Sequence, residues 1–496
     1  MNWEFLIQNK ESLLVSTDTR NLPAGCVFFA LHGANFDGNK FAQQALEQGA
    51  SLVVIDDPEV FSTLNPQLSY TSSASDRSSK GEIRTLNSQH SYTSSASDRS
   101  SKGEIRTLTS QLLLVEDTLL ALQDLARAWR RHLGLPIIGV TGTNGKTTTK
   151  ELLATVLSTK YNLHYTQGNL NNQIGVPLTL LSLTTAHELA IVEMGASHPG
   201  DIKELVDIAE PNYGLITNVG RAHLEGFGSF EGVQRTKQEL YDYLVAHNGT
   251  IFRNTDNPYL AAMHSNAARE FRSLGVQEFR STSEPLNRAA SELSEPLNSK
   301  ASESSEPLNS KASEPSEPLN SDFVAYTTGV MPDGTRLIGA YNAENISAAL
   351  CVGEYFGVDR EQGLAAIRQY VPTNNRSQAM TTERNRLIVD AYNANPTSMQ
   401  AAISVFKGDT FILGAMRELG EYTHLEHQNV VNMLAERKAD LVFLVGEEYR
   451  LTTSPYPIFD TVDQLHAYLE EHPLTDKHIL LKGSRSTHIE QLLDIL

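Results

Sequence analysis

Residues 139–150 read GVTGTNGKTTTK and connect the apolar run LPIIGV (135–140) to the helical pattern ELLATVLSTKY (151–161). A glycine-rich turn between a strand and a helix surrounds an anion with backbone N–H groups and the positive end of the helix dipole. Lys146 adds a cation for the phosphates, and Thr147 offers a hydroxyl to magnesium. The pattern therefore predicts a nucleoside triphosphate site in an α/β domain.

This loop departs from the strict G-x-x-x-x-G-K-[ST] pattern, because Val140 stands where that pattern has glycine. The alternative is an ordinary glycine-rich turn, but such a turn rarely carries G-K-T-T directly after a strand. The residues that we predict to bind the nucleotide here are Gly142, Thr143, Asn144, Gly145, Lys146, Thr147 and Thr148.

The composition is that of a globular protein with several domains. The chain has 496 residues, which is too long for one hydrophobic core and corresponds to about three domains of ~150 residues. Hydrophobic residues make up 40% of the chain and leave ample apolar surface to bury. The formal net charge of -19 argues against a general nucleic-acid binder, although one glycine-rich loop can still bind an anionic substrate.

The sequence predicts a cytoplasmic location. Cys26 and Cys351 are the only two cysteines, and they lie far apart without metal-binding spacing, which favours a reducing compartment. Residues 1–10 (MNWEFLIQNK) lack the pattern of a signal peptide. No stretch reaches the ~20 apolar residues of a membrane helix. We therefore expect no membrane anchor.

Two repetitive polar stretches interrupt the globular pattern. SYTSSASDRSSKGEIRTL occupies residues 69–86 and recurs at 91–108, and SEPLN begins at residues 283, 294, 305 and 316. These stretches contain few large apolar residues to compensate the entropy that is lost when a chain orders. We predict disordered surface insertions at 67–111 and 281–321; the alternative is a pair of partner-binding segments.

Elsewhere, strand-like apolar runs alternate with helical patterns, which predicts an α/β protein with parallel sheets flanked by helices. We expect an N-terminal α/β domain at 1–112, a central P-loop-type domain at 113–373 and a C-terminal Rossmann-like domain at 374–496. The expected strands are 135–140, 189–194, 213–219, 386–392, 410–416, 440–446 and 478–483, and the expected helices are 201–209, 345–355, 399–406, 425–436 and 489–496.

The loop TGTNGKTT resembles that of the Mur ligase family and its folylpolyglutamate synthase relatives. Further motifs of this family follow in the expected order and span nearly the whole chain outside the repetitive stretches. They are TQGNLNNQIGVPLTLL (166–181), VEMGAS (192–197), TNVGRAHLEGFGSFEGVQRTKQELY (217–241), NTDNP (254–258), YNAENISAAL (341–350), NNRSQ (374–378), DAYNANPTSM (390–399) and LKGSR (481–485).

Two segments resemble the branch of the family that adds D-alanyl-D-alanine to UDP-N-acetylmuramoyl-tripeptide in peptidoglycan precursor synthesis. They are DAYNANPTSM (390–399) and LGAMRELGEYTHLEHQ (413–428), and the DNPR motif of the diaminopimelate-adding ligases is absent. Residues 16–50 resemble a UDP-sugar-binding domain, which folylpolyglutamate synthases lack. The branch usually has aspartate where this chain has Ala415, which affects either local hydrogen bonding or the dipeptide site.

The resemblance implies an ATP-dependent ligase that activates a carboxylate as an acyl phosphate, which an amine then attacks. Phosphoryl transfer mostly requires positioning and neutralisation of charge. The implied ligands of two magnesium ions are Thr147, Glu193, His223 and Lys237, with Lys237 carrying a carbamate, and the implied catalytic residues are Lys146, Lys237, Glu193 and His223.

Each of these residues also has a plainer interpretation. Glu193 ends an apolar strand, where ligands bind in open α/β sheets, which favours a metal-bridging carboxylate; the alternative is a cap on a neighbouring helix. His223 is a less usual magnesium ligand than an oxygen and without the family would be an ordinary loop histidine. Lys237 alone would lie on a solvated helix face, and an unmodified ammonium would repel metals.

The resemblance implies further substrate contacts. For the nucleotide they are Asn254, Asp256, Arg376 and Asp390, and for the UDP-sugar and peptide substrates they are Thr19, Arg20, Asn169, Asn172, Tyr392, Asn393, Asn395 and Ser398. The guanidinium of Arg20 suits bidentate phosphate binding. The asparagines at 169 and 172, and the NTDNP segment, have turn formation as the alternative.

Other functions remain open at the level of sequence. One is a related ligase that adds a single amino acid to a muramoyl precursor or glutamate to a folate. Another is a catalytically impaired nucleotide-binding homologue, which Ala415 and the two insertions would favour. A P-loop motor or kinase is disfavoured, because the motifs after the phosphate loop follow the ligase order. We expect a monomer.

Overall fold

The computed structural model describes residues 3–33, 36–65, 107–108, 111–263, 323–339, 341–372 and 376–496. Most of the two predicted insertions, 67–111 and 281–321, lies outside these residues. The described residues form two compact units. The first unit draws on Met1–Leu135, Thr166–Glu188 and Asp207–Glu210, and the second on Pro136–Tyr165, Leu189–Val206 and Pro211–Leu496.

A five-stranded sheet of order β1-β2-β5-β7-β6 lies in the first unit. Its strands are β1 (Val15–Ser16), β2 (Val27–Phe29), β5 (Leu52–Ile55), β6 (Thr107–Leu108) and β7 (Leu112–Leu114), all parallel except β6. The unit also has the two-stranded sheet β3 (His32–Gly33) and β4 (Phe36–Asp37), with α1 (Glu4–Ile7), η1 (Gly38–Phe41), α2 (Ala42–Glu47), α3 (Pro58–Leu64), α4 (Thr118–Leu133) and α6 (Gly175–Leu181).

The central sheet has six parallel strands in the order β13-β12-β11-β8-β10-β9. They are β8 (Ile137–Thr141), β9 (Leu163–Tyr165), β10 (Leu189–Glu193), β11 (Tyr213–Ile216), β12 (Thr250–Asn254) and β13 (Phe323–Tyr326). From β8 the chain first builds β9 and β10 on one side and then β11, β12 and β13 on the other. Ligands of open α/β sheets bind at such a reversal, outside the carboxyl ends of the strands.

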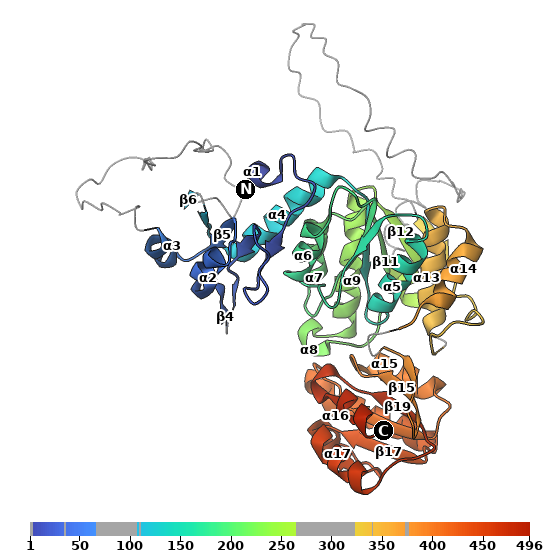
Figure 1. The fold of residues 1–496 in the computed structure, drawn as a ribbon. Helices are drawn as coiled ribbons and strands as arrows, with labels where there is room; N and C mark the ends of the chain where they lie inside the picture. The colour runs from blue at the N-terminus through green and yellow to red at the C-terminus, as the bar shows by residue number, and fades with distance from the viewer. Residues whose placement is uncertain are drawn as a thin grey trace, which may run out of the picture. The chain divides into compact units, whose positions relative to one another are not determined.

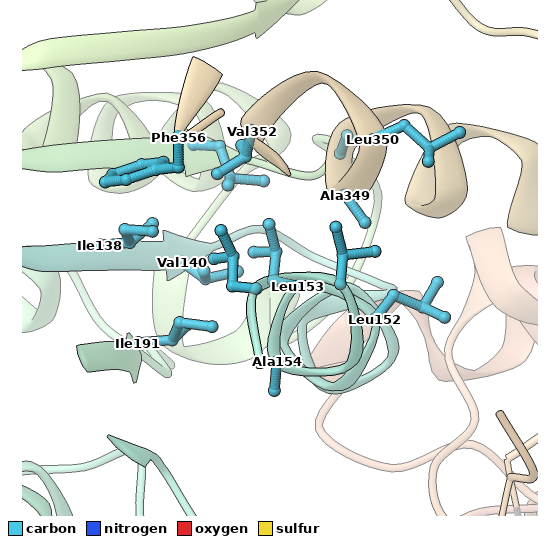
Figure 2. Close-up of a cluster of buried hydrophobic side chains, with 14 of the residues drawn as sticks. Ile138, Val140, Leu152, Leu153, Ala154, Ile191, Ala349, Leu350, Val352 and Phe356 are labelled. Atoms are coloured by element: carbon cyan, nitrogen blue, oxygen red, sulfur yellow. The ribbon is translucent and has the colours of Figure 1, made fainter. Parts of the chain in front are cut away.

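Helices cover this sheet and build its core. They are α5 (Lys146–Leu157), α7 (Asp201–Ala209), α8 (Leu224–Phe227), α9 (Phe230–Ala246), α10 (Pro258–Met263), α13 (Asn342–Tyr355) and α14 (Arg360–Gln369). Helices α5 and α13 lie side by side (Figure 1). Figure 2 shows Leu153 of α5 between Val140 of β8 and the α13 face that carries Ala349 and Val352. This buried contact packs the second half of α5, the helix that follows the phosphate loop, between β8 and α13.

The C-terminal sheet has the order β14-β15-β19-β16-β17-β18, and only β14 is antiparallel to its neighbour. Its strands are β14 (Gln378–Thr381), β15 (Arg386–Asp390), β16 (Thr410–Gly414), β17 (Leu441–Val445), β18 (Ile458–Phe459) and β19 (His478–Lys482). Its helices are α15 (Pro396–Val405), α16 (Thr423–Glu436) and α17 (Val462–Glu471), with the short 3-10 turns η2 (Gly420–Tyr422), η3 (Glu447–Leu451), η4 (Arg485–Thr487) and η5 (Ile489–Asp494).

Residues of β16 alternate between two cores on opposite faces of this sheet. Phe411 and Leu413 belong to the cluster that contains α15 and α16, whereas Ile412 belongs to the cluster that contains α17 and η5. This period of two is that of a strand buried on both faces. The C-terminal domain is therefore doubly wound, as its continuous apolar runs predict.

The expected elements are present with small differences at their ends. The seven expected strands correspond to β8, β10, β11, β15, β16, β17 and β19. The expected helix 489–496 was wrong in type, because residues 489–494 form the 3-10 helix η5. Its buried residues Ile489 and Leu492 are three apart, a spacing that both helix types share. The domain boundaries at 112 and 373 stay predictions. In the described residues, no helix has the length and apolar character to cross a membrane.

Candidate active site

The backbone between β8 and α5 requires its glycines. Gly142 has φ 143° and Gly145 has φ 77°, a region that side chains with a Cβ rarely adopt. A Cβ at Gly142 would lie 2.0 Å from Thr217 Oγ1, and one at Gly145 would lie 2.6 Å from Asn345 Oδ1. Neighbouring segments therefore approach the loop so closely that only glycine fits.

The segment after β11 supports the phosphate loop through hydrogen bonds. Thr217 Oγ1 donates to the carbonyl of Asn144 over 2.6 Å, and the N–H of Asn144 donates to Asn218 Oδ1 over 3.0 Å. The N–H of Thr143 donates to the carbonyl of Asn218 over 3.0 Å. These hydrogen bonds to the backbone of Thr143 and Asn144 fix the conformation of the loop. Thr148 is half-buried in the first turn of α5.

Lys146 lies across this loop. Its Nζ donates to the carbonyl of Gly142 over 2.6 Å and to that of Thr143 over 3.1 Å. Burial lowers the pKa of Lys146 to about 8, with Glu193 opposing that shift and Arg376 adding to it. A buried cation beside a second cation is poorly stabilised, and an anion would relieve both. The arrangement is therefore suited to phosphate.

Lys237 belongs to the same electrostatic group, although it comes from α9. It is 2% exposed, and its pKa is well below the usual value because of burial and the charge of Lys146; Asp201 and Glu239 act in the opposite direction. The interpretation of Lys237 as a residue on a solvated face is therefore wrong. Its amine is buried within the field of the phosphate loop.

Glu193 ends β10 with its carboxylate facing the start of α5. It is 2% exposed, and its Oε1 accepts from Thr147 Oγ1 over 3.2 Å. Its Oε2 lies 3.5 Å from Lys150 Nζ. A carboxylate and a hydroxyl at this distance are the oxygen donors that magnesium prefers.

His223 and Lys237 both lie near the ring of Phe227. The His223 ring lies 6.3 Å from that of Phe227 in an edge-on arrangement, and Lys237 Nζ lies 5.5 Å from the Phe227 centroid. His223 also contacts the carboxylate of Glu418, and this hydrogen bond lowers the pKa of Glu418. Among the residues with described structure, no three His, Cys, Asp or Glu side chains form a ready-made metal cage.

Two polar contacts organise the carboxyl ends of β15 and β19. Lys482 Nζ, which is 1% exposed, lies 2.5 Å from Asp390 Oδ2 and donates to the carbonyl of Asn393 over 3.3 Å. The Arg376 guanidinium stacks on Tyr392 with its Cζ 3.7 Å from the ring centroid. Because Tyr392 follows Asp390 by two residues, the stacking places Arg376 beside the segment after β15. The charge of Arg376 also acts on Lys146, whose pKa it lowers.

Asn395 begins α15 and connects it to the phosphate loop. Its Oδ1 accepts from the N–H of Ser398 over 2.9 Å, and Ser398 Oγ accepts from the N–H of Asn395 over 3.1 Å, which completes a capping box. Its Nδ2 donates to Asn144 Oδ1 over 2.8 Å. The structure therefore brings a predicted dipeptide residue into contact with the predicted nucleotide loop.

Asn254 and Asp256 make the turn that the alternative interpretation describes. Asn254 Nδ2 donates to Thr328 Oγ1 over 3.0 Å, and its Oδ1 accepts from the N–H of Asp256 over 3.0 Å. Asp256 Oδ2 accepts from the N–H of Thr328 over 2.7 Å. These bonds fasten the segments after β12 and β13 to each other.

Four predicted substrate residues belong to the first unit. Arg20 is exposed and its guanidinium forks onto Asp18, with Nε 3.0 Å from Oδ1 and 2.9 Å from Oδ2. Hydrogen bonds from Arg20 lower the pKa of Asp18 to about 2. Thr19 is buried, Asn169 is exposed, and Asn172 Oδ1 accepts from the N–H groups that begin α6. The assignment of these residues to the UDP-sugar and peptide stays a prediction.

Comparison with known proteins identifies the family. The chain matches the Mur ligase middle domain over residues 140–353, the Mur ligase glutamate ligase domain over 375–492 and the catalytic domain of the Mur ligase family over 13–130. The UDP-N-acetylmuramoyl-tripeptide--D-alanyl-D-alanine ligase of Bacillus subtilis is 30% identical and is aligned over 97% of this chain and 92% of its own. The chain belongs to the Mur ligase family.

Other relatives and solved structures agree with this assignment. The ligase of the same name from Synechocystis is 32% identical over 88% of this Mur ligase and 79% of its own chain. The crystal structure of MurF from Acinetobacter baumannii aligns with a TM-score of 0.69 at 24% identity and covers 97% of this chain and 92% of its own. MurF from Thermotoga maritima in complex with ADP aligns with a TM-score of 0.67 at 23% identity over 98% and 97%. The predicted three-domain α/β fold is confirmed.

Sequence reasoning missed several residues that this Mur ligase places around the loop. Asn345 Oδ1 accepts from Thr149 Oγ1 over 3.0 Å, and Asn345 Nδ2 donates to Asn342 Oδ1 over 2.9 Å. The motif YNAENISAAL contains both asparagines three residues apart, so they share one helix face. Lys150 follows Lys146 by four residues on α5, and the same rule would have placed it beside the loop.

Proposed function

We propose that this Mur ligase uses ATP to join D-alanyl-D-alanine to the terminal carboxylate of UDP-N-acetylmuramoyl-tripeptide. The observation that carries the proposal is a site in which Lys146 contacts the carbonyls of the glycine loop and the oxygens of Thr147 and Glu193 pair beside it. The buried Lys237 interacts electrostatically with Lys146. The relatives that bear the name of this activity align over nearly the full chain and support it.

In the proposed reaction the tripeptide carboxylate attacks the γ-phosphorus of ATP and ADP leaves, which gives an acyl phosphate. The amine of D-alanyl-D-alanine attacks the acyl carbon, phosphate leaves, and the nitrogen loses a proton to give the amide. Lys146 and Arg376 neutralise the charge of the transferring phosphoryl group, and the loop holds it in line. The support for both roles is the repulsion that Arg376 exerts on Lys146, which adds to burial in lowering the pKa of the lysine.

Two magnesium ions would fit this site, with Thr147, Glu193, His223 and a carbamylated Lys237 as their ligands. When bound, they would supply positive charge to the phosphate oxygens. Burial and the charge of Lys146 hold the pKa of Lys237 well below its usual value, so its amine loses its proton more readily than that of an ordinary lysine. A neutral amine adds to carbon dioxide, losing one proton as the N–C bond forms. The product is an anion that offers oxygen donors where the unmodified side chain offers none.

The other substrate contacts follow the family resemblance. Thr19 and Arg20 in the first unit are proposed for the UDP-sugar, with Asn169 and Asn172 for the acceptor. Tyr392, Asn393, Asn395 and Ser398 are proposed for the dipeptide, and Asn254, Asp256 and Asp390 for the nucleotide. The free thiols of Cys26 and Cys351 and the nucleotide-linked substrate agree with a cytoplasmic enzyme, which we expect to be monomeric.

Release of inorganic phosphate with different combinations of substrates tests this proposal. We expect rapid release only when ATP, UDP-N-acetylmuramoyl-tripeptide and D-alanyl-D-alanine are all present. Replacing the dipeptide by D-alanine, lysine or diaminopimelate, or the acceptor by a folate, should reduce the rate to background. Faster turnover with a single amino acid would identify a different ligase of the family. Nucleotide binding without turnover under saturating substrates would identify an impaired homologue.

A further inference from the structure

We propose that Lys150 is a positioning residue that fixes the carboxylate of Glu193 for the divalent cation. The inference rests on the proposed function, because it assumes that Glu193 is a metal ligand. Lys150 is not part of the glycine loop, and it lies one helical turn beyond Lys146 on the same face of α5. Its role would be exerted through Glu193 and not through the nucleotide.

Both carboxylate oxygens of Glu193 are contacted by side chains of α5. Lys150 Nζ lies 3.5 Å from Glu193 Oε2, whereas Glu193 Oε1 accepts from Thr147 Oγ1. The side chains of Lys150 and Glu193 are 1% and 2% exposed. A carboxylate that is contacted at both oxygens has little freedom to rotate. The oxygen on the side of Thr147 therefore stays directed at the start of α5, where magnesium would bind.

Burial of Lys150 requires an explanation, because a lysine usually extends its ammonium into water. Taking an ammonium out of water is costly unless a charge partner and further contacts compensate it. Glu193 supplies the partner, and the Tyr165 ring lies 5.8 Å from Nζ. Loss of Lys150 would remove the contact to Glu193 Oε2, so the carboxylate would turn away from its present orientation.

The sign of the effect separates positioning from simple electrostatics. Lys150 is a cation near a metal site, so Coulomb repulsion alone predicts that its removal strengthens metal binding. Positioning predicts the opposite, because a reoriented Glu193 is a poorer ligand. Loss of a residue that supports a metal ligand typically weakens metal binding about 10–100-fold.

The experiment measures Mn²⁺ binding by electron paramagnetic resonance in the presence of a non-hydrolysable ATP analogue. We expect Lys150→Met to weaken Mn²⁺ binding at least about tenfold, and Lys150→Arg to restore most of it. Binding of the nucleotide analogue in EDTA should change less than about threefold. The matched control is Lys160→Met, because Lys160 Nζ donates to the carbonyls of Phe356 and Gly357 and not to Glu193.

A double-mutant cycle shows whether Lys150 acts through Glu193. In a Glu193→Gln background, Lys150→Met should cause no further loss of Mn²⁺ affinity. The double variant lacks both charges of the pair, so the effect of Lys150→Met can still be measured in this background if Lys150→Met alone fails to fold. Circular dichroism of each variant reports folding.

The outcomes separate this inference from the proposed function. Mn²⁺ binding by Glu193→Gln as tight as by wild type would overturn the proposed metal site itself. Weak binding by Glu193→Gln together with unchanged or tighter binding by Lys150→Met would overturn only the role of Lys150. Lys150→Met could also reduce Mn²⁺ affinity by the same factor in the wild-type and Glu193→Gln backgrounds. That result would overturn the role of Lys150 as well, because the lysine would then act independently of the carboxylate.

Discussion

The Lys146 ammonium donates to the backbone carbonyl of Gly142 over 2.6 Å, so the lysine closes its own loop. A nucleotide would exchange this carbonyl for phosphate oxygens, which are stronger partners for a cation. The exchange requires little movement, because Thr217 and Asn218 already hold the loop. The loop is therefore preorganised, and phosphate oxygens can replace the carbonyl partners of Lys146.

Lys146→Ala should abolish catalysis without unfolding the protein. The substitution removes a cation from the phosphates but only two loop carbonyl contacts from the fold. We expect the rate of amide formation to fall by at least about 100-fold. Mass spectrometry of the product measures this, and the melting temperature should stay close to that of wild type. Product formation at the wild-type rate would exclude the phosphate loop from the reaction.

Nucleotide affinity should fall as the pH rises above about 8. The pKa of Lys146 is lowered to about 8 in the free protein, and a bound phosphate would raise it. Below that pH the lysine is charged in both states and contributes its full attraction; above it, binding requires uptake of a proton and weakens. Titration calorimetry of ADP between pH 7 and 10 measures the slope, and Lys146→Arg should flatten it. A wild-type affinity that is constant over this range would contradict the shift.

Local patterns in the sequence predicted most of the second unit. Continuous apolar runs predicted β8 and β10, which are buried along their whole length. The run 213–219 predicted a longer strand than β11, which ends at Ile216 because Thr217 and Asn218 turn to bind Asn144. In the first unit, β1 has only two residues, too few for a period of two to appear.

Residues of the site that act through distant partners were harder to predict. Gly145 and Lys146 follow from the local motif, whereas the approach of Asn345 to Gly145 depends on how α13 packs on α5. Burial of Lys237 likewise could not be read from the sequence, because the pattern around it shows only a helix face. Family resemblance selected Lys237, and the fold provides the physical reason for its lowered pKa.

Lys237 should carry a carbamate in solutions that contain bicarbonate. Burial and the charge of Lys146 lower the pKa of its amine, which favours the neutral form that reacts with carbon dioxide. ¹³C NMR of the protein in ¹³C-bicarbonate should show a carbamate signal that is absent from Lys237→Arg. Lys237→Arg should also lose most of the activity. A fully active Lys237→Arg enzyme would rule out the carbamate as a metal ligand.

Substitutions at Asn395 should separate stability from catalysis. Asn395→Ser keeps a side chain that can cap α15 but removes the amide that donates to Asn144, so we expect stability near wild type and a higher KM for the dipeptide. Asn395→Ala removes the cap as well and should lower the free energy of unfolding by about 1 kcal/mol. Urea denaturation and steady-state kinetics measure the two effects. Equal kinetics for wild type and Asn395→Ser would show that the contact with Asn144 is dispensable.

Transfer of ¹⁸O from the tripeptide carboxylate to phosphate tests the central claim most directly. If Lys146 and its loop direct phosphorylation of that carboxylate, each phosphate released with D-alanyl-D-alanine present should carry one ¹⁸O from the labelled carboxylate, as measured by ³¹P NMR. Phosphate that contains no ¹⁸O, formed together with the amide, would contradict the account.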